Sequence, residues 1–147
     1  LKERIREMAE RLISVAAERE LRTAPALTPP EDMWEQFLTR FPYAETDDQM
    51  QAIDDVLDDL GSGKPMDRLV CGDVGFGKTE VAIRAAFVAA TSGVQVAIIA
   101  PTTLLARQHY RGFVERFRGF PINVMTLSPV SYLNLTLPTI YPVYISV

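Results

Sequence analysis

The chain has 147 residues, of which 48% are hydrophobic and 23% are charged, so it can bury the core of one domain and is not a disordered tail. Its net charge of −4 excludes a global attraction to nucleic acid, and any such contact must come from a local patch. A single cysteine, Cys71, excludes an internal disulfide, and no secretory signal or membrane-spanning stretch is seen. We therefore expect a cytoplasmic protein without membrane contact.

The first 40 residues predict a helical segment with a linker. Apolar residues at helical spacing make residues 1–22 an amphipathic helix, and three prolines within residues 23–30 then break the pattern. A short helix follows and ends at Pro42. Its apolar face consists of Trp34, Phe37, Leu38 and Phe41. This face favours docking onto the next domain, with binding of a partner as the alternative.

The next helix begins with a capping box, Thr46-x-x-Gln49, and its apolar face runs to Leu60. Beyond it the periodicity alternates between strand and helix. We expect strands at residues 67–71, 94–100 and 122–127, and helices at residues 78–91 and 101–118. The order strand, helix, strand, helix, strand predicts an α/β fold with a parallel sheet, preceded by the N-terminal helices. Cys71 would be a small core residue of the first strand.

Between the first strand and the helix that begins near Lys78, eight residues spell G-x-x-x-x-G-K-[ST]. They are Gly72, Asp73, Val74, Gly75, Phe76, Gly77, Lys78 and Thr79. Glycines let the backbone wrap a phosphate, and the helix start adds its dipole. The pattern predicts a nucleotide phosphate site in which Lys78 reaches the β- and γ-phosphates and Thr79 holds Mg²⁺. The alternative is a glycine-rich turn without a ligand.

Two further motifs flank this P-loop. Phe41-Pro42-Tyr43 and the capping box precede it, and Pro101-Thr102-Thr103 follows the second strand. The layout resembles the first motor domain of superfamily 2 helicases, with a Q motif, motif I and motif Ia. Within that superfamily, residues 66–82 look like the bacterial transcription-repair coupling family, whereas the related RecG helicases usually have Ser at the place of Phe76. The resemblance covers roughly residues 1–128 and implies a partial RecA-like domain.

The resemblance implies an ATP-driven translocase on double-stranded DNA with RNA polymerase as a partner. Gln49 would read the adenine edge, and Phe41 or Tyr43 would contact its face. Thr102 and Thr103 would bind a DNA phosphate. Plainer roles stay open: Gln49 is also half of a capping box, Phe41 also suits a core, and the two threonines also suit a helix start.

The resemblance fails after Ser128. The 29 residues after Arg118 contain no charged side chain, and the acidic pair of motif II is missing. We expect an N-terminal segment at residues 1–40, a partial RecA-like ATP-binding domain at 41–128 and an aberrant tail at 129–147, explained better by a frame change or truncated reading than by a designed element. The chain itself would then bind ATP without turnover. A small P-loop kinase or GTPase is the less favoured alternative, because its lid arginines or Asn-Lys-x-Asp motif are missing.

Overall fold

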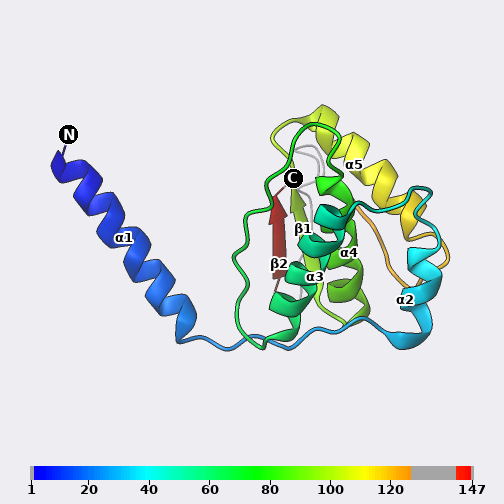
Figure 1. Cartoon of the computed structure of the whole chain (residues 1–147), viewed down its shortest axis with the longest axis horizontal. Coiled ribbons are helices and arrows are strands. Elements are labelled where there is room, and N and C mark those ends of the chain that lie inside the picture. The colour runs from blue at the N-terminus through cyan, green and yellow to red at the C-terminus, as the bar shows by residue number, and fades with distance from the viewer. Residues whose placement is uncertain (1, 127–141, 147) are drawn as a thin grey trace, which may run out of the picture.

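The structure is a computed structural model that describes residues 2–126 and 142–146 (Figure 1). In chain order its elements are α1 (Lys2–Glu20), α2 (Glu31–Leu38), α3 (Asp47–Gly61), α4 (Lys78–Thr91), β1 (Gln95–Ile99), α5 (Thr103–Arg116) and β2 (Pro142–Ser146). Most of the predicted tail, 129–147, lies outside the described residues. Among the helices that are described, none is long and apolar enough to cross a membrane.

Helix α1 confirms the first predicted helix and extends away from the other elements (Figure 1). None of its described side chains is buried, and Leu12 is 68% exposed. The end of the helix meets the rest of the chain through two exposed ion pairs, Arg19 with Asp67 and Glu20 with Lys64. Such pairs contribute little to stability, so the fold of the remaining chain depends little on α1.

Helix α2 docks on the domain that follows it, as its apolar face predicts. Phe37 is fully buried and stacks on Phe87 of α4, with ring centroids 4.0 Å apart. Three aromatic residues from α5 and the turn beyond it complete this cluster: Phe113, Phe117 and Phe120. The helix ends at Leu38, so Phe41 lies in the following loop.

Helix α3 begins with the predicted capping box, in which both reciprocal bonds between Thr46 and Gln49 are present. Its face packs on α4 through a second cluster that includes Ile53, Val56 and Leu60 of α3 and Val81, Ala85 and Val88 of α4. Small residues let α4 approach its neighbours on several sides, and nearly every residue from Glu80 to Ala89 is buried. Helix α4 is therefore the centre of both clusters.

The sheet differs from the prediction. β1 pairs in parallel with β2, from Gln95 opposite Pro142 to Ile99 opposite Ser146. The strands predicted at residues 67–71 and 122–127 were wrong as far as the structure describes them, because residues 67–71 and 122–126 form no strand. Residue 127 lies outside the described residues. The predicted order of three strands is therefore not what the structure has.

The segment before the P-loop shows why its strand prediction failed. An extended segment becomes a strand only when a neighbour takes its backbone hydrogen bonds. Here Arg68 instead holds the segment against α3 by ion pairs with Asp55 and Asp59. Leu69 is 86% exposed, and Cys71 is exposed rather than in the core, which corrects its predicted role.

Candidate nucleotide-binding site

The P-loop lies between this extended segment and the start of α4. Gly75 and Gly77 both have φ +87°, a left-handed conformation that residues with a side chain rarely adopt. Gly77 is the N-cap of α4. The first N–H groups of a helix have no partner within the helix, and its dipole favours anions. The loop therefore brings its backbone to a helix start that suits a phosphate.

Lys78 curls back over the loop. Its Nζ donates to the backbone carbonyls of Gly72 at 2.5 Å and Asp73 at 2.9 Å. The ammonium group thus lies against the loop that a phosphate would enter, where it can exchange these carbonyls for phosphate oxygens. Thr79 follows in the first turn of α4 and is partly buried.

Two glycines of the loop lie close against neighbouring side chains. A Cβ atom on Gly72 would lie 2.4 Å from the ring of Phe76, and one on Gly77 would lie 2.7 Å from Nε2 of Gln49. A side chain at Gly77 would also be strained by its positive φ. Gly72 therefore leaves space for the Phe76 ring, and Gly77 leaves space for the Gln49 side chain that approaches from α3.

Gln49 joins the start of α3 to the P-loop. Its Oε1 accepts from the backbone N–H of Thr46 at 2.9 Å, and its Nε2 donates to the backbone carbonyl of Phe76. The structure thus brings Gln49 to the predicted site, 27 residues from its loop partner in sequence. In this arrangement both ends of the amide have a protein partner, so reading adenine would require Gln49 to give up at least one of them.

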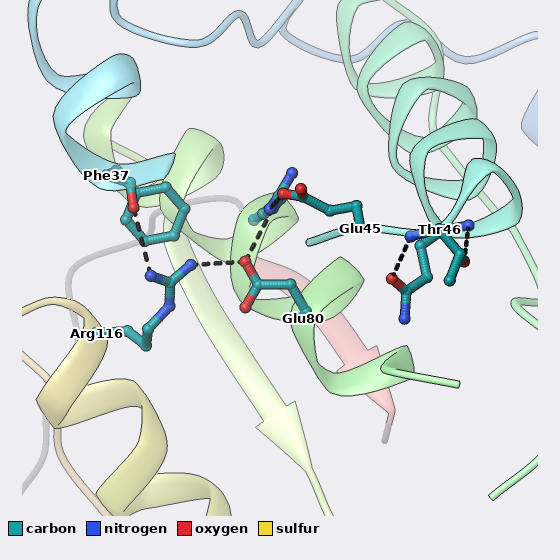
Figure 2. A network of polar contacts seen from close by, with 7 residues as sticks. Phe37, Glu45, Thr46, Glu80 and Arg116 are labelled. Atoms are coloured by element: carbon teal, nitrogen blue, oxygen red, sulfur yellow. Dashed lines mark hydrogen bonds and ion pairs between the residues drawn. The ribbon is translucent and has the colours of Figure 1, made fainter. Parts of the chain in front are cut away.

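Directly after the P-loop in sequence, a buried charge network links α4 to α5, to α2 and to the segment before α3 (Figure 2). Oε1 of Glu80 accepts from Nε of Arg84 at 2.9 Å and from Nη2 of Arg116 at 2.6 Å. Arg84 also pairs with Glu45, and Arg116 donates to the backbone carbonyl of Phe37 at 3.3 Å. Glu80 is 8% exposed and Arg84 is 2% exposed.

The pKa values in this network follow from its contacts. The hydrogen bond from Arg84 holds the pKa of Glu45 below its usual value of 4.5. Burial lowers the pKa of Arg116, and the charge and hydrogen bond of Glu80 oppose that effect. Nε of Arg116 is buried with no hydrogen-bond partner among the described residues. The Arg116 guanidinium therefore depends strongly on Glu80 and on the Phe37 carbonyl.

The predicted aromatic contacts to adenine lie beside this network. The ring centroid of Phe41 is 5.5 Å from the guanidinium carbon of Arg84 and 5.6 Å from that of Arg116, within reach of cation–π attraction. Tyr43 meets Phe41 edge to face at 5.5 Å and is 73% exposed. Phe41 thus has protein partners of its own, and Tyr43 presents the more open ring.

The predicted DNA-contact residues lie at the start of α5. The side chain of Thr102 accepts from the backbone N–H of Leu105 at 3.2 Å, which makes it the N-cap. Thr103 is the first residue of the helix, and both threonines are exposed. The plain capping role of Thr102 is confirmed, and the exposure leaves both hydroxyls accessible to a ligand.

Sequence reasoning missed the contact of Gln49 with the loop and the network around Glu80. The first could not be found, because it joins residues far apart in sequence. The second had a signal: Glu80 and Arg84 are spaced i,i+4 in a helix otherwise rich in alanine and valine, where an ion pair must be buried.

A magnesium ion fits the oxygen chemistry of this site. Thr79 offers a hydroxyl, a hard ligand of the kind Mg²⁺ takes together with phosphate oxygens and water. No group of three or more His, Cys, Asp or Glu gathers within residues 2–126 and 142–146 to hold a metal by itself. A cation here would therefore be shared with the nucleotide phosphates.

An α/β arrangement with a P-loop at a helix start defines a nucleotide-binding protein of the P-loop class. The DEAD/DEAH box helicase family matches residues 46–134, more than half of the chain. The chain belongs to this family. Its helicase domains are built on a RecA-like α/β fold, and the coarse fold prediction is thereby confirmed.

The relatives narrow this further. The chain is 48% identical over 134 residues to the transcription-repair-coupling factor of Rickettsia bellii, 50% over 124 residues to that of Bacillus subtilis and 52% over 126 residues to that of Haemophilus influenzae. These matches cover 84 to 88% of the chain but only 10 to 12% of the relatives. The resemblance seen in the sequence is confirmed.

A solved structure of RecG bound to a three-way DNA junction is also similar. It matches 75% of this chain and 15% of its own, with a TM-score of 0.67 and 38% sequence identity. The relationship to ATP-dependent DNA helicases and translocases therefore holds in both sequence and fold.

Proposed function

We propose that this chain carries the ATP-binding half-site of an ATP-driven double-stranded DNA translocase of the transcription-repair coupling kind. The observation that carries the proposal is the P-loop at the start of α4, with Lys78 lying over its carbonyls. In such a motor the other half of the site comes from a second lobe, and the two lobes close on ATP.

The residues of the loop would act together on the triphosphate. Backbone N–H groups of residues 72–79 and the α4 dipole would bind the phosphate oxygens, and Lys78 would move from the Gly72 and Asp73 carbonyls to the β- and γ-phosphates. Thr79 would hold Mg²⁺, which supplies charge compensation for the phosphates. Lys78 is the residue we assign to catalysis in the intact motor.

Base selection would rest on Gln49 and Phe41. If the Gln49 amide exchanges its bond to the Phe76 carbonyl for the adenine edge, nucleotide binding would release the loop from α3. Phe41, or the more exposed Tyr43, would cover the face of the base. This arrangement supports ATP over GTP as the nucleotide.

The remaining assignments follow the same family. Thr102 and Thr103 would contact a phosphate of duplex DNA through their hydroxyls and the N–H groups of the α5 start. RNA polymerase would be the partner on which the intact motor acts. The proposed division into residues 1–40, 41–128 and 129–147 stays a prediction.

Binding without turnover is the second candidate function of the chain as printed. Beyond Glu80 the sequence contains one carboxylate side chain, Glu115, and that residue is exposed on α5. Glu80 itself accepts hydrogen bonds from two arginines, Arg84 and Arg116. Neither carboxylate is placed to orient an attacking water, and catalysis of phosphoryl transfer depends on such positioned groups.

Titration with a fluorescent ATP analogue in the presence of Mg²⁺ tests the proposed site. Lys78→Ala should weaken ATP binding by at least about tenfold. The charged phosphates lose the hydrogen bonds of the Lys78 ammonium, and hydrogen bonds to charged groups contribute about 1.5–3 kcal/mol. Lys64→Ala is the matched control, since the Lys64 ammonium forms a surface ion pair with Glu20 away from the P-loop. Equal affinity in the wild type and Lys78→Ala would show that this loop is not the nucleotide site.

A further inference from the structure

The network around Glu80 offers a function that the P-loop does not itself explain. Glu80 directly follows Thr79 and lies in the first turn of α4. One of its oxygens, Oε1, binds both Arg84 on the same helix and Arg116 in the last turn of α5 (Figure 2). A single carboxylate oxygen thus connects the helix start at the phosphate site to the helix whose other end carries Thr102 and Thr103.

Packing alone does not require this connection. Ile83 and Phe87 of α4 already share one hydrophobic cluster with Phe113 of α5 and with Phe117, the C-cap of that helix. A buried ion pair pays a desolvation penalty and is often no more stabilising than apolar residues of the same volume. What it adds is a defined geometry, because breaking one partner leaves the other charge buried and uncompensated.

The geometry of α5 lets a small movement at Arg116 reach the far end. The helix has 14 residues, which corresponds to about 20 Å at 1.5 Å per residue. A packed helix moves as a unit, so a change in the direction of its last turn displaces its start. Glu80 lies in the first turn of α4, the turn that a phosphate bound at the P-loop would contact.

We propose that Glu80 is a positioning residue that couples nucleotide binding at the P-loop to duplex DNA binding at the start of α5 through Arg116. The proposal rests on the proposed function, which places ATP and DNA at those two ends. Arg84 and Glu45 extend the same network to the residue before Thr46, the N-cap of the helix that carries Gln49. The first turn of α4, the last turn of α5 and the segment before α3 are thereby linked by one set of charges.

The test measures the affinity of the chain for a labelled short DNA duplex, with and without Mg²⁺ and a non-hydrolysable ATP analogue. In the wild type the two dissociation constants should differ by about fivefold or more, the lower range of measured couplings between sites. Glu80→Gln keeps an oxygen acceptor but removes the charge. In this variant the DNA dissociation constants with and without the ATP analogue should differ by less than about twofold. Its separate affinities for nucleotide and for DNA should change much less.

Three further variants separate coupling from plain stability. Arg116→Met should lose the coupling, whereas Arg116→Lys should keep part of it because the cation remains. Glu115→Gln changes the neighbouring exposed carboxylate and should keep the full coupling. Melting temperatures identify any variant that fails to fold, and Arg116→Lys then serves as the mildest perturbation. Loss in Glu80→Gln and Arg116→Met with retained single affinities supports the proposal.

Other outcomes overturn it. If the wild type binds both ligands without coupling, or if Glu80→Gln keeps the full ratio, Glu80 does not connect the sites, while the proposed function stands. If the wild type binds no ATP analogue, or no DNA, the proposed function fails at that site and the inference fails with it. The two failures are therefore distinguishable from the same titrations.

Discussion

Gln49 shows how one side chain can serve a helix and a ligand loop together. Its Oε1 completes the capping box of α3, and its Nε2 holds the Phe76 carbonyl. The capping box was predictable because it depends on residues three apart, whereas the loop contact depends on tertiary structure. A residue that links a helix start to the P-loop is well placed to respond when a nucleotide enters.

Gln49→Ala should narrow the preference for ATP over GTP by about fivefold, since one hydrogen bond contributes about 1 kcal/mol. Competition of each nucleotide against a fluorescent ATP analogue measures the preference. Gln51→Ala on the same helix is the control, because Gln51 bonds Asp55 and not the loop. A wild type that binds ATP and GTP equally would leave Gln49 with a structural role alone.

Glu45 predicts a pH dependence of stability. Arg84 lowers its folded pKa below the usual 4.5, so the unfolded chain binds the proton more readily than the folded one. This stabilisation is present above about pH 4.5 and is lost as the pH falls through the lowered folded pKa. The free energy of unfolding should therefore fall in that acid range, and less steeply in Glu45→Gln.

Urea unfolding between pH 7 and pH 3 measures this difference. Asp59, whose pKa Arg68 also lowers, should leave a residual slope in Glu45→Gln. Identical acid slopes in the wild type and Glu45→Gln would mean that the bond between Glu45 and Arg84 does not persist in solution.

At the scale of elements, the helices and the strand predicted at 94–100 were confirmed, whereas residues 67–71 and 122–126 form no strand. The helices at 47–61, 78–91 and 103–116 carry their signals locally, in caps and in apolar periodicity. A strand needs a partner, and the apolar run at 67–71 has none among the described strands, so Arg68 and α3 hold it instead. The site followed the same rule: the P-loop is a local motif, whereas the bonds from Glu80 to Arg116 and from Gln49 to Phe76 depend on tertiary structure.

Because Phe37 docks α2 on α4, its truncation should cause a large loss of stability. Phe37→Ala should lower the free energy of unfolding by about 3–5 kcal/mol, because the ring is fully buried against Phe87. Leu12→Ala on the exposed α1 should change it by no more than about 0.5 kcal/mol. Urea denaturation measures the free energy of unfolding of both variants. A similarly small decrease in both would show that α2 does not dock as described.

At the scale of the whole molecule, the proposed function makes the chain one part of a motor. It spans 10 to 12% of the relatives it matches, and the P-loop falls within that part. Binding ATP needs the loop and the helix start, which the chain has. Turnover needs further charges around the γ-phosphate, and loss of an arginine finger alone can reduce the rate by about 10³-fold or more. We therefore propose that this chain holds ATP without hydrolysing it.

Incubation with radiolabelled ATP and Mg²⁺, with and without duplex DNA, tests this proposal when both retained nucleotide and released phosphate are counted. We expect the wild type to retain intact ATP, Lys78→Ala to retain little, and phosphate release to stay at the background rate with either DNA condition. DNA-stimulated phosphate release that Lys78→Ala abolishes would show a complete active site and contradict the claim. Failure of the wild type to retain ATP would contradict it from the other side.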